Sequence, residues 1–371
     1  MLQSIQQIEL DHVQIPLHEP FRISTAEVAV KDAIIIKLIT NEGIGYGEAS
    51  PMAGAFYNDE TPESNWDDLV ENLIPALLKH GPIEATDVIE ELDRISDQQF
   101  AKAGLESAFW VAQANARAVP LYTLFGSSAR AIPSGVAIGI YPTADELLER
   151  VEKYLIQGYR RVKIKVKPGW DLEPLTRIRQ AWPKIPLMVD ANAAYDLTHV
   201  DALKALDDFD LMMIEQPLAA DALDQSAELQ AQIKTPICLD ESADTLHAVS
   251  AIADKKAGRI INIKLQRVGG ITRSLQMHYL AKERNLPCWL GTMPELGVGA
   301  AAGLHLATLG NFQFPTDVES ADRWFVDDLL EPPIVIDAGG LLHIPDGPGL
   351  GYRPSPEKIR KYSRRHERIA R

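Results

Sequence analysis

Charged residues recur at a nearly constant interval through the middle of the chain, and this spacing limits the folds that the chain can adopt. Lys165, Asp190, Glu215, Asp240 and Lys264 follow one another at intervals of 25, 25, 25 and 24 residues, each at the end of a short apolar run. A short apolar run followed by an amphipathic stretch is typical of a β-strand and its crossover helix. The repeat therefore predicts parallel strands with one charge at each carboxyl end.

The same rhythm of strand and helix extends on both sides of these five positions and gives eight units. Eight parallel strands with crossover helices close into a barrel, and charges at their carboxyl ends project into one mouth, where barrel enzymes do their chemistry. A charged residue that only opens a surface loop would not recur in register five times. The predicted strands span residues 134–138, 161–166, 187–190, 211–215, 237–240, 260–264, 287–291 and, with a weaker pattern, 313–318.

The flanking regions have a different pattern. The first 50 residues alternate in the manner of β-structure, and helical spacing follows from residue 59 to 118. The run 334–344, with Gly339-Gly340 in its middle, predicts a hairpin that rejoins the N-terminal β-structure. Residues 353–371 hold eight Lys or Arg against two Glu, which favours a solvated helix or a frayed end.

Charge and cysteine content exclude several classes of protein. The 37 basic and 52 acidic residues leave a net charge of −15, which disfavours binding to nucleic acid or to an anionic membrane. No run is long and apolar enough to span a membrane, and the N-terminus lacks the pattern of a secretion signal. Cys238 and Cys288 both lie in apolar strand candidates, so we expect no disulfide scaffold and a reducing, cytoplasmic location.

Three carboxylates in one barrel mouth predict a metal site. Asp190, Glu215 and Asp240 would repel one another there, and a divalent cation removes the conflict. Because the predicted ligands are all oxygen atoms with no His or Cys nearby, they favour a hard ion, Mg²⁺ or alternatively Mn²⁺, over zinc. Waters and a substrate carboxylate would complete its coordination.

Lys165 and Lys264 are predicted to flank this metal from opposite sides of the barrel. Lys163 and Lys165 lie on one strand face, because side chains alternate with period two. At ~5 Å and an effective dielectric of ~20, two such charges repel by about 3 kcal/mol, which favours a neutral amine able to act as a general base. A metal on the substrate carboxylate together with a lysine on either face predicts proton abstraction α to that carboxylate, followed by elimination or reprotonation.

Two other classes remain open on the residues alone. A Schiff-base or pyridoxal-phosphate barrel would use one lysine and a glycine-rich phosphate cradle, and it leaves three inward carboxylates without a function. A catalytically silent barrel, kept for binding or structure, would be free to lose a ligand or a lysine, whereas all five positions are filled.

These motifs resemble the enolase superfamily, in particular its muconate-lactonizing-enzyme-like subgroup, over nearly the whole chain. The segment Gly104-Leu105-Glu106-Ser107 resembles a helix of the family's capping domain. The motifs that carry the resemblance are Lys163-Ile164-Lys165, Asp190-Ala191-Asn192, Ile214-Glu215-Gln216-Pro217, Leu239-Asp240-Glu241-Ser242, Asn262-Ile263-Lys264 and Val268-Gly269-Gly270.

The resemblance implies an α/β fold with two parts. A (β/α)7β TIM-like barrel would span residues 131–320, and an α+β capping domain would comprise residues 1–130, completed by about 321–371. It also implies that residues 20–24 and 52–57 close over the mouth of the barrel, although surface loops have a similar composition. A homo-oligomer and a small-molecule carboxylate substrate are expected.

Within the subgroup, the chain is most similar to o-succinylbenzoate synthases that also racemise N-succinylamino acids. The shared segments are 165–171, 267–270 and 320–325. The resemblance implies a Mg²⁺-dependent syn dehydration that supplies menaquinone biosynthesis, with N-acylamino acid racemisation as a second or main role, or another cycloisomerase activity of the subgroup. The Asp-x-Asp signature of dipeptide epimerases is absent, because Asp317-Val318-Glu319 stands in its region.

The same resemblance assigns roles to single residues. Lys165 would remove the α-proton and protonate the departing hydroxide, while Lys264 would stabilise the enolate or act as the base on the opposite face. Lys163 would tune Lys165, and Arg267 matches an arginine linked to racemase capability. Ser134 and Asn192 are either substrate hydrogen-bonders or ordinary strand-end polar residues. Further predicted binding residues are Glu241, Met293 and Glu295.

The chain also departs from the family pattern beside the predicted pocket. Leu265-Gln266 stands before Arg267, where relatives read Pro-Gly, and the loop 291–296 differs from the Met-Ile-Glu-Thr of relatives. The exact substrate is therefore not predicted by the resemblance.

Overall fold

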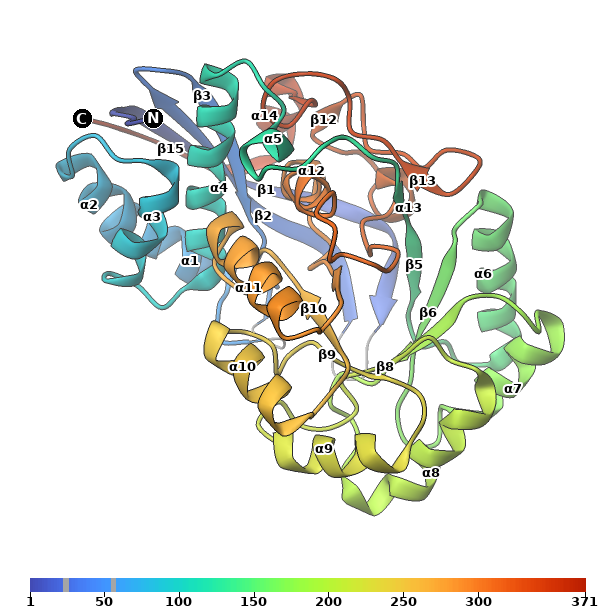
Figure 1. Cartoon of the computed structure of the whole chain (residues 1–371). Coiled ribbons are helices and arrows are strands. Elements are labelled where there is room, and N and C mark those ends of the chain that lie inside the picture. The colour runs from blue at the N-terminus through green and yellow to red at the C-terminus, as the bar shows by residue number, and fades with distance from the viewer. Residues whose placement is uncertain (23–26, 55–57) are drawn as a thin grey trace.

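The computed structural model describes residues 1–22, 27–54 and 58–371, and it has two parts (Figure 1). An antiparallel sheet with its helices forms one part, and a curled parallel sheet with helices on its outer side forms the other. Parts of the two segments predicted to close over the mouth, residues 23–24 and 55–57, lie outside the described residues.

The antiparallel sheet joins both ends of the chain. Its strand order is β15-β1-β2-β3, and Gln7 of β1 pairs with Ala370 of β15, so the two termini lie close together in Figure 1. The apolar residues predicted to form β-structure, such as Ile8, Leu10 and Ile36, are fully buried in it. The strands are β1 (Ile5–Arg22), β2 (Glu27–Thr40), β3 (Ile44–Ala49) and β15 (Ser363–Ala370).

Helix α4 (Gln99–Ala116) packs against β3 with almost no space between the two backbones. A Cβ atom at Gly45 would lie 1.9 Å from the carbonyl oxygen of Ala108, and one at Gly47 would lie 1.9 Å from that of Gly104. Glycine at these strand positions therefore permits the contact. Although α4 is buried along nearly all of its length, no helix among the described residues is long and apolar enough to cross a membrane.

Shorter helices complete the N-terminal part. Helix α1 begins with a capping box, in which the side chains of Thr61 and Ser64 each accept a hydrogen bond from the backbone N–H of the other residue. The helical elements before the barrel are α1 (Pro62–Asp68), the π-helical turn η1 (Leu69–Leu73), α2 (Ile74–Lys79), α3 (Ala85–Asp93) and α5 (Leu121–Leu124).

The parallel sheet has seven strands in the order β11-β10-β9-β8-β7-β6-β5, and it curls as the predicted barrel requires (Figure 1). Its strands are β5 (Gly135–Ile138), β6 (Arg161–Lys165), β7 (Leu187–Asp190), β8 (Ile214–Glu215), β9 (Ile237–Leu239), β10 (Ile260–Ile263) and β11 (Cys288–Leu290). Its helices are α6 (Ala144–Gln157), α7 (Leu172–Ala181), η2 (Leu197–His199), α8 (Val200–Ala205), η3 (Leu206–Phe209), α9 (Leu223–Gln232), α10 (Leu246–Lys255), α11 (Ile271–Glu283) and α12 (Gly297–Leu306).

The predicted eighth strand, residues 313–318, lies where it was expected but is not a regular strand. Phe312 forms a parallel bridge with Cys288 at one edge of the sheet, and Thr316 forms one with Ser134 at the other. The segment therefore connects β11 to β5 and closes the barrel through isolated bridges.

The C-terminal region differs from two predictions. The run 334–344 does not rejoin the N-terminal sheet, because β13 (Leu341–Leu342) pairs with β4 (Ile132–Pro133). The basic tail is neither a helix throughout nor a frayed end, since α14 (Pro356–Tyr362) leads into β15. Most side chains of β15 are exposed, so backbone pairing with β1 holds this strand, and an apolar pattern could not reveal it. The remaining elements are α13 (Ala321–Trp324), β12 (Leu330–Glu331) and β14 (Arg353–Pro354).

Because α4 packs so closely on β3, even one added methyl group in β3 is expected to destabilise the fold. Replacement of Gly45 by Ala is expected to lower the free energy of unfolding by about 1–3 kcal/mol, because the new Cβ collides with the backbone of α4. Urea denaturation measures the change. Gly81→Ala is the control, since nothing lies within 4 Å of a Cβ at Gly81. Equal urea midpoints for the two variants would contradict this account of the packing.

Candidate active site

The five charged side chains with the regular spacing meet at the carboxyl ends of the parallel strands. Lys165 pairs in register with Asp190, and Asp190 with Glu215, across β6, β7 and β8. Asp240 directly follows β9, and Lys264 directly follows β10. All five are at most 8% exposed. Because three strands separate β6 from β10 in the curled sheet, the two lysines approach the acids from opposite sides.

Each of these lysines contacts a different acid. Lys165 Nζ lies 2.6 Å from Asp190 Oδ2, and Lys264 Nζ lies 2.7 Å from Asp240 Oδ2. Lys165 also donates a hydrogen bond to Asn192 Oδ1 at 2.8 Å. The site therefore has two separate ammonium–carboxylate pairs in a buried mouth.

A third cation, Lys163, lies below them with a partner that the sequence analysis did not assign to the site. Arg161, Lys163 and Lys165 alternate along β6 and are all buried. Asp317, from the segment that closes the barrel, bonds to Lys163 through Oδ2, and its Oδ1 lies 2.6 Å from Arg161 Nη2. The alternation of three cations on one strand face was a signal that a buried acid had to exist.

The charges around Lys163 keep it protonated. Burial alone would lower the pKa of its ammonium, but Asp317, Glu215 and Asp190 outweigh this effect and raise the pKa well above its ordinary value. Lys163 Nζ lies 3.2 Å from Glu215 Oε2 and 3.7 Å from Asp190 Oδ2, and 4.9 Å from the ring centre of Trp289. Lys163 is therefore a fixed positive charge beneath the mouth.

The clustered acids differ in their affinity for a proton. Burial, together with the charges of Asp190 and Asp240, raises the pKa of Glu215 to about 8 against the opposing effect of Lys163. Burial also acts to raise the pKa of Asp240, but Arg267 and Lys264 overcome it and hold that pKa below the ordinary value. Glu215 thus has one neighbouring cation, Lys163, which it shares with Asp317 and Asp190, whereas Asp240 contacts both Lys264 and Arg267.

These residues fit a hard divalent cation. Asp190, Glu215 and Asp240 are buried and carry only oxygen donors, and the charges of Asp190 and Asp240 help to raise the pKa of Glu215, which is a conflict that a bound cation relieves. Over residues 1–22, 27–54 and 58–371, no three His, Cys, Asp or Glu side chains already enclose a metal position. Lysine and arginine groups lie on the carboxylate oxygens instead.

Asn192 and Glu241 extend the network from Lys165 across the mouth. Asn192 Nδ2 donates to Glu241 Oε1 at 3.2 Å, so the asparagine connects the lysine to a second acid. Burial, followed by the charge of Asp240, raises the pKa of Glu241 to about 7. Glu241 Oε2 has no hydrogen-bond partner in the part of the chain that the structure describes. The structure thus brings both predicted residues to the site.

Arg267 also lies where the sequence placed it. Its Nη1 pairs with Asp240 Oδ1, and its Nη2 donates to the carbonyl oxygens of Asn262 at 2.9 Å and Ala243 at 3.3 Å. Arg267 therefore shares Asp240 with Lys264 and joins the ends of two strands.

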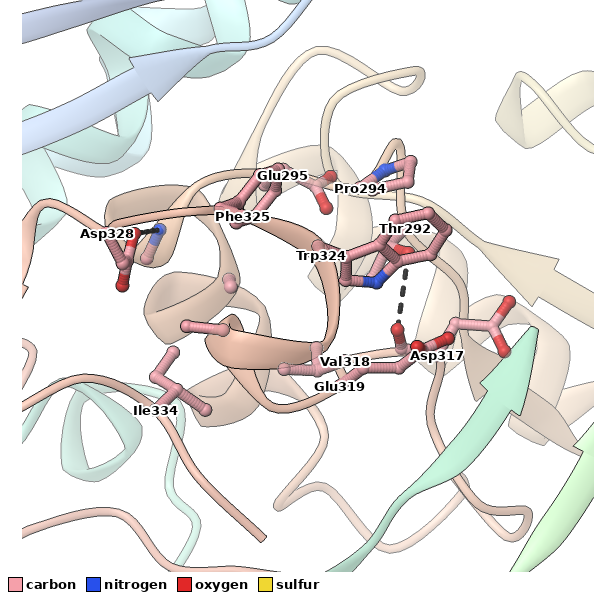
Figure 2. A pocket seen from close by; sticks show the side chains of 13 residues that line it. Thr292, Pro294, Glu295, Asp317, Val318, Glu319, Trp324, Phe325, Asp328 and Ile334 are labelled. Atoms are coloured by element: carbon pink, nitrogen blue, oxygen red, sulfur yellow. Dashed lines mark hydrogen bonds between the residues drawn. The ribbon is translucent and has the colours of Figure 1, made fainter. Parts of the chain in front are cut away.

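Met293 and Glu295 lie in the loop after β11, on the side of the mouth that borders the N-terminal sheet. The carbonyl oxygen of Met293 accepts a hydrogen bond from Lys31 Nζ at 3.1 Å, and its N–H donates to Glu295 Oε2 at 3.1 Å. Figure 2 shows Glu295 opposite Asp317 around a cavity of about 20 Å³, which Trp324 and Phe325 also line. The Glu295 carboxylate thus bonds within its own loop.

Ser134 is not part of this group, which corrects the prediction that it could contact substrate. It precedes β5, so it lies at the amino end of the strand, and its hydroxyl donates to the carbonyl oxygen of Val318 at 2.6 Å. Ser134 therefore helps to close the barrel. A polar residue beside an apolar run indicates a strand end, but it does not show which end faces the site.

A cavity of about 690 Å³ lies beside the acids, between the two parts of the molecule. Glu241 and Arg267 line it from the barrel side, and Asn58, Gln99 and Lys102 line it from the N-terminal part. A volume of this size accommodates a small-molecule ligand. Of the residues of the site, Glu241 and Arg267 therefore border a space bounded by both parts.

Comparison with known proteins identifies the family. Residues 5–126 match the N-terminal domain of mandelate racemase / muconate lactonizing enzyme, and residues 146–358 match the enolase C-terminal domain-like family. The chain belongs to this family of the enolase superfamily. Its enzymes generally depend on a divalent metal.

Individual relatives match along almost the whole chain. An o-succinylbenzoate synthase of Geobacillus kaustophilus is 40% identical over 97% of this chain and 96% of its own. An N-succinylamino acid racemase of Amycolatopsis is 39% identical over 95% of both chains. A solved enolase-superfamily structure from Listeria innocua superposes with a TM-score of 0.94 at 35% identity, covering 99% of each chain. The chain is therefore an enzyme, related to both dehydratases and racemases.

The charge balance around Lys163 predicts a large loss of stability when this residue is neutralised. Lys163→Met leaves buried acids without their cation, so we expect the free energy of unfolding to fall by about 3–5 kcal/mol in the presence of a chelator. Lys37→Met is the control, because Lys37 pairs with Glu9 at 2.9 Å in a partly exposed position, where about 0–1 kcal/mol is expected. Similar unfolding midpoints for the two variants would show that Lys163 is not the balancing charge.

Proposed function

We propose that this enzyme is a Mg²⁺-dependent o-succinylbenzoate synthase with N-succinylamino acid racemase activity. The observation that carries the proposal is the placement of Lys165 and Lys264 on opposite sides of three buried carboxylates. Relatives at 39–40% identity that are named for these two activities support it. The product would serve menaquinone biosynthesis.

The ligands of the metal would be Asp190, Glu215 and Asp240. Their buried oxygen donors suit Mg²⁺, with Mn²⁺ as the alternative. When bound, the cation offsets the negative charge that develops on the substrate carboxylate as the α-proton leaves. The ammonium groups of Lys165 and Lys264, which contact Asp190 and Asp240, would face the substrate from its two sides.

Lys165 would act as base and then as acid in the dehydration. Its neutral amine takes the α-proton, and the electron pair of the C–H bond moves toward the carboxylate. The carbon–carbon double bond then forms as the C–O bond to the hydroxyl group breaks, and Lys165 returns its proton to the departing hydroxide to give water. Asn192, bonded to Lys165 Nζ at 2.8 Å, orients the amine.

Lys264 would act on the opposite face of the substrate. As an ammonium it stabilises the enolate during dehydration, and in racemisation it exchanges a proton with the α-carbon on the side away from Lys165. Arg267, which matches an arginine linked to racemase capability, shares Asp240 with Lys264. This contact supports racemisation either as a second activity or as the main one. Lys163 supplies a fixed positive charge near the substrate carboxylate.

The two parts of the chain would have different roles. Residues 131–320 carry the acids and lysines, and residues 1–130 with about 321–371 would cap the mouth of the barrel. The cavity shared by Glu241, Arg267 and residues of the N-terminal part supports this division. Met293 and Glu295, in the loop that contacts Lys31, would border the substrate.

Hydrogen exchange at the α-carbon tests the proposal directly. In D₂O, the wild-type enzyme with Mg²⁺ is expected to introduce deuterium into members of a panel of N-succinylamino acids, because both lysines reach the α-proton. Lys165→Ala is expected to abolish dehydration and racemisation, and Lys264→Ala to abolish racemisation and to impair dehydration strongly. NMR and mass spectrometry follow the label. Near-normal turnover by Lys165→Ala would refute the assignment of the base.

Removal of one carboxylate charge tests the metal site. Asp240→Asn is expected to weaken Mg²⁺ binding by about tenfold or more in calorimetric titration, because one anionic ligand is lost. Asp224→Asn is the control, since Asp224 lies on α9 and pairs there with Lys255. Unchanged Mg²⁺ affinity in Asp240→Asn would remove Asp240 from the ligand set.

A further inference from the structure

The loop from Leu265 to Gly270 connects Lys264 to helix α11, and the N-terminal part of the chain holds it. Every residue of the loop is buried. It carries Arg267, whose guanidinium pairs with Asp240, so its position affects two cations of the site. The sequence Leu265-Gln266 in this loop is also where the chain departs from the family pattern.

Gln266 joins this loop to the end of strand β3. Its side chain is fully buried, its Oε1 accepts a hydrogen bond from the backbone N–H of Ser50 at 3.1 Å, and its Nε2 donates to the carbonyl oxygen of Glu48 at 2.7 Å. One amide thus satisfies two backbone groups of the neighbouring part. A buried amide with both ends bonded fixes position, because loss of either bond leaves an unsatisfied polar group.

Glu106 of α4 holds the other end of the same loop. Its carboxylate accepts hydrogen bonds from the backbone N–H groups of Ile271 at 2.7 Å and Thr272 at 2.9 Å. Gly270 makes this approach possible, because it has φ of +128° and a Cβ there would lie 2.4 Å from Glu106 Oε2. The loop is therefore held at both ends by residues that belong to the N-terminal part.

We propose that Gln266 is a positioning residue for Lys264, and that it acts on one face of the substrate only. The loop that it holds follows Lys264 and includes Arg267, whereas Lys165 lies on β6 and bonds to Asp190 and Asn192. Loss of the Gln266 contacts therefore shifts one base relative to the α-carbon and leaves the other in place. This inference rests on the proposed function, since it assumes that each lysine serves one enantiomer.

The test measures α-proton exchange separately for the two enantiomers of one substrate. The probe is the N-succinylamino acid of the D₂O panel that wild-type enzyme exchanges fastest. The enantiomer that Lys165→Ala still exchanges is assigned to Lys264, and the enantiomer that Lys264→Ala still exchanges is assigned to Lys165. In Gln266→Met, exchange through Lys264 is expected to fall by about tenfold or more, because misplacement by ~1 Å can cost ~100-fold. Exchange through Lys165 is expected to change by less than about threefold.

Gln230→Met is the matched control. Gln230 is also buried, donates through Nε2 to the carbonyl oxygen of Thr235 at 3.2 Å and accepts through Oε1 from the N–H of Ile237 at 2.7 Å. It makes the same two kinds of contact, but at the amino end of β9, away from the mouth. Both variants are expected to lose similar amounts of thermal stability, and only Gln266→Met is expected to change the ratio of the two exchange rates.

The possible results separate the two proposals. If wild-type enzyme exchanges neither enantiomer, the proposed function fails. If wild-type enzyme exchanges both, and Gln266→Met lowers both rates equally or neither, the positioning role of Gln266 is wrong. Should Gln266→Met not fold, Gln266→Asn replaces it, because it adds no charge and keeps the amide, but its shorter side chain cannot hold both bonds, to Ser50 and to Glu48, at their present lengths. This variant must then also lower exchange through Lys264 and leave exchange through Lys165 nearly unchanged.

Discussion

Alternate residues of β6 carry three cations into the interior of a barrel, and each requires an acid from a neighbouring strand. An unpaired ion in this environment costs several kcal/mol, so the charges can be tolerated only as a network. Asp317 bonds to both Arg161 and Lys163, Glu215 also contacts Lys163, and Asp190 meets Lys165 at the mouth. The pair of Lys165 and Asp190 at the mouth thus lies above a second group of charges, which is buried further back along β6.

With every acid ionised, the bonded network would have five cations and five acids and be formally neutral. A divalent cation adds two positive charges, and an N-succinylamino acid brings two carboxylates, so both together leave the sum unchanged. Protonation of Glu215, whose pKa is raised to about 8, also contributes to this balance. The cations are Arg161, Lys163, Lys165, Lys264 and Arg267, and the acids are Asp190, Glu215, Asp240, Glu241 and Asp317.

The sequence predicted the features that follow from the regular repeat of strands and helices, and it missed those that depend on which residues come into contact in the fold. The repeat of about 25 residues was sufficient to align Lys165 with Asp190 and Glu215, because parallel strands of equal units end at one edge. Asp317 and Ser134 show the limit: both lie beside apolar residues, yet the side chain of Asp317 bonds to Lys163, whereas the hydroxyl of Ser134 bonds to the backbone of Val318. β15 was missed because its pairing uses backbone groups that no side-chain pattern encodes.

Helices α11 and α12 of the barrel lack a side-chain cap from their own N-cap residues, and acids of the N-terminal part bond to their first turns instead. Glu106 accepts from the first N–H groups of α11, and Glu48 accepts from Leu296 at 2.7 Å and Gly299 at 2.7 Å at the start of α12. Such caps stabilise a helix by about 0.5–2 kcal/mol each. Helices α11 and α12 follow the strands that precede Lys264 and Met293, so the N-terminal part stabilises the side of the mouth where these residues lie. Glu106 on α4, far along the chain from Lys264, thereby helps to hold the loop that follows Lys264.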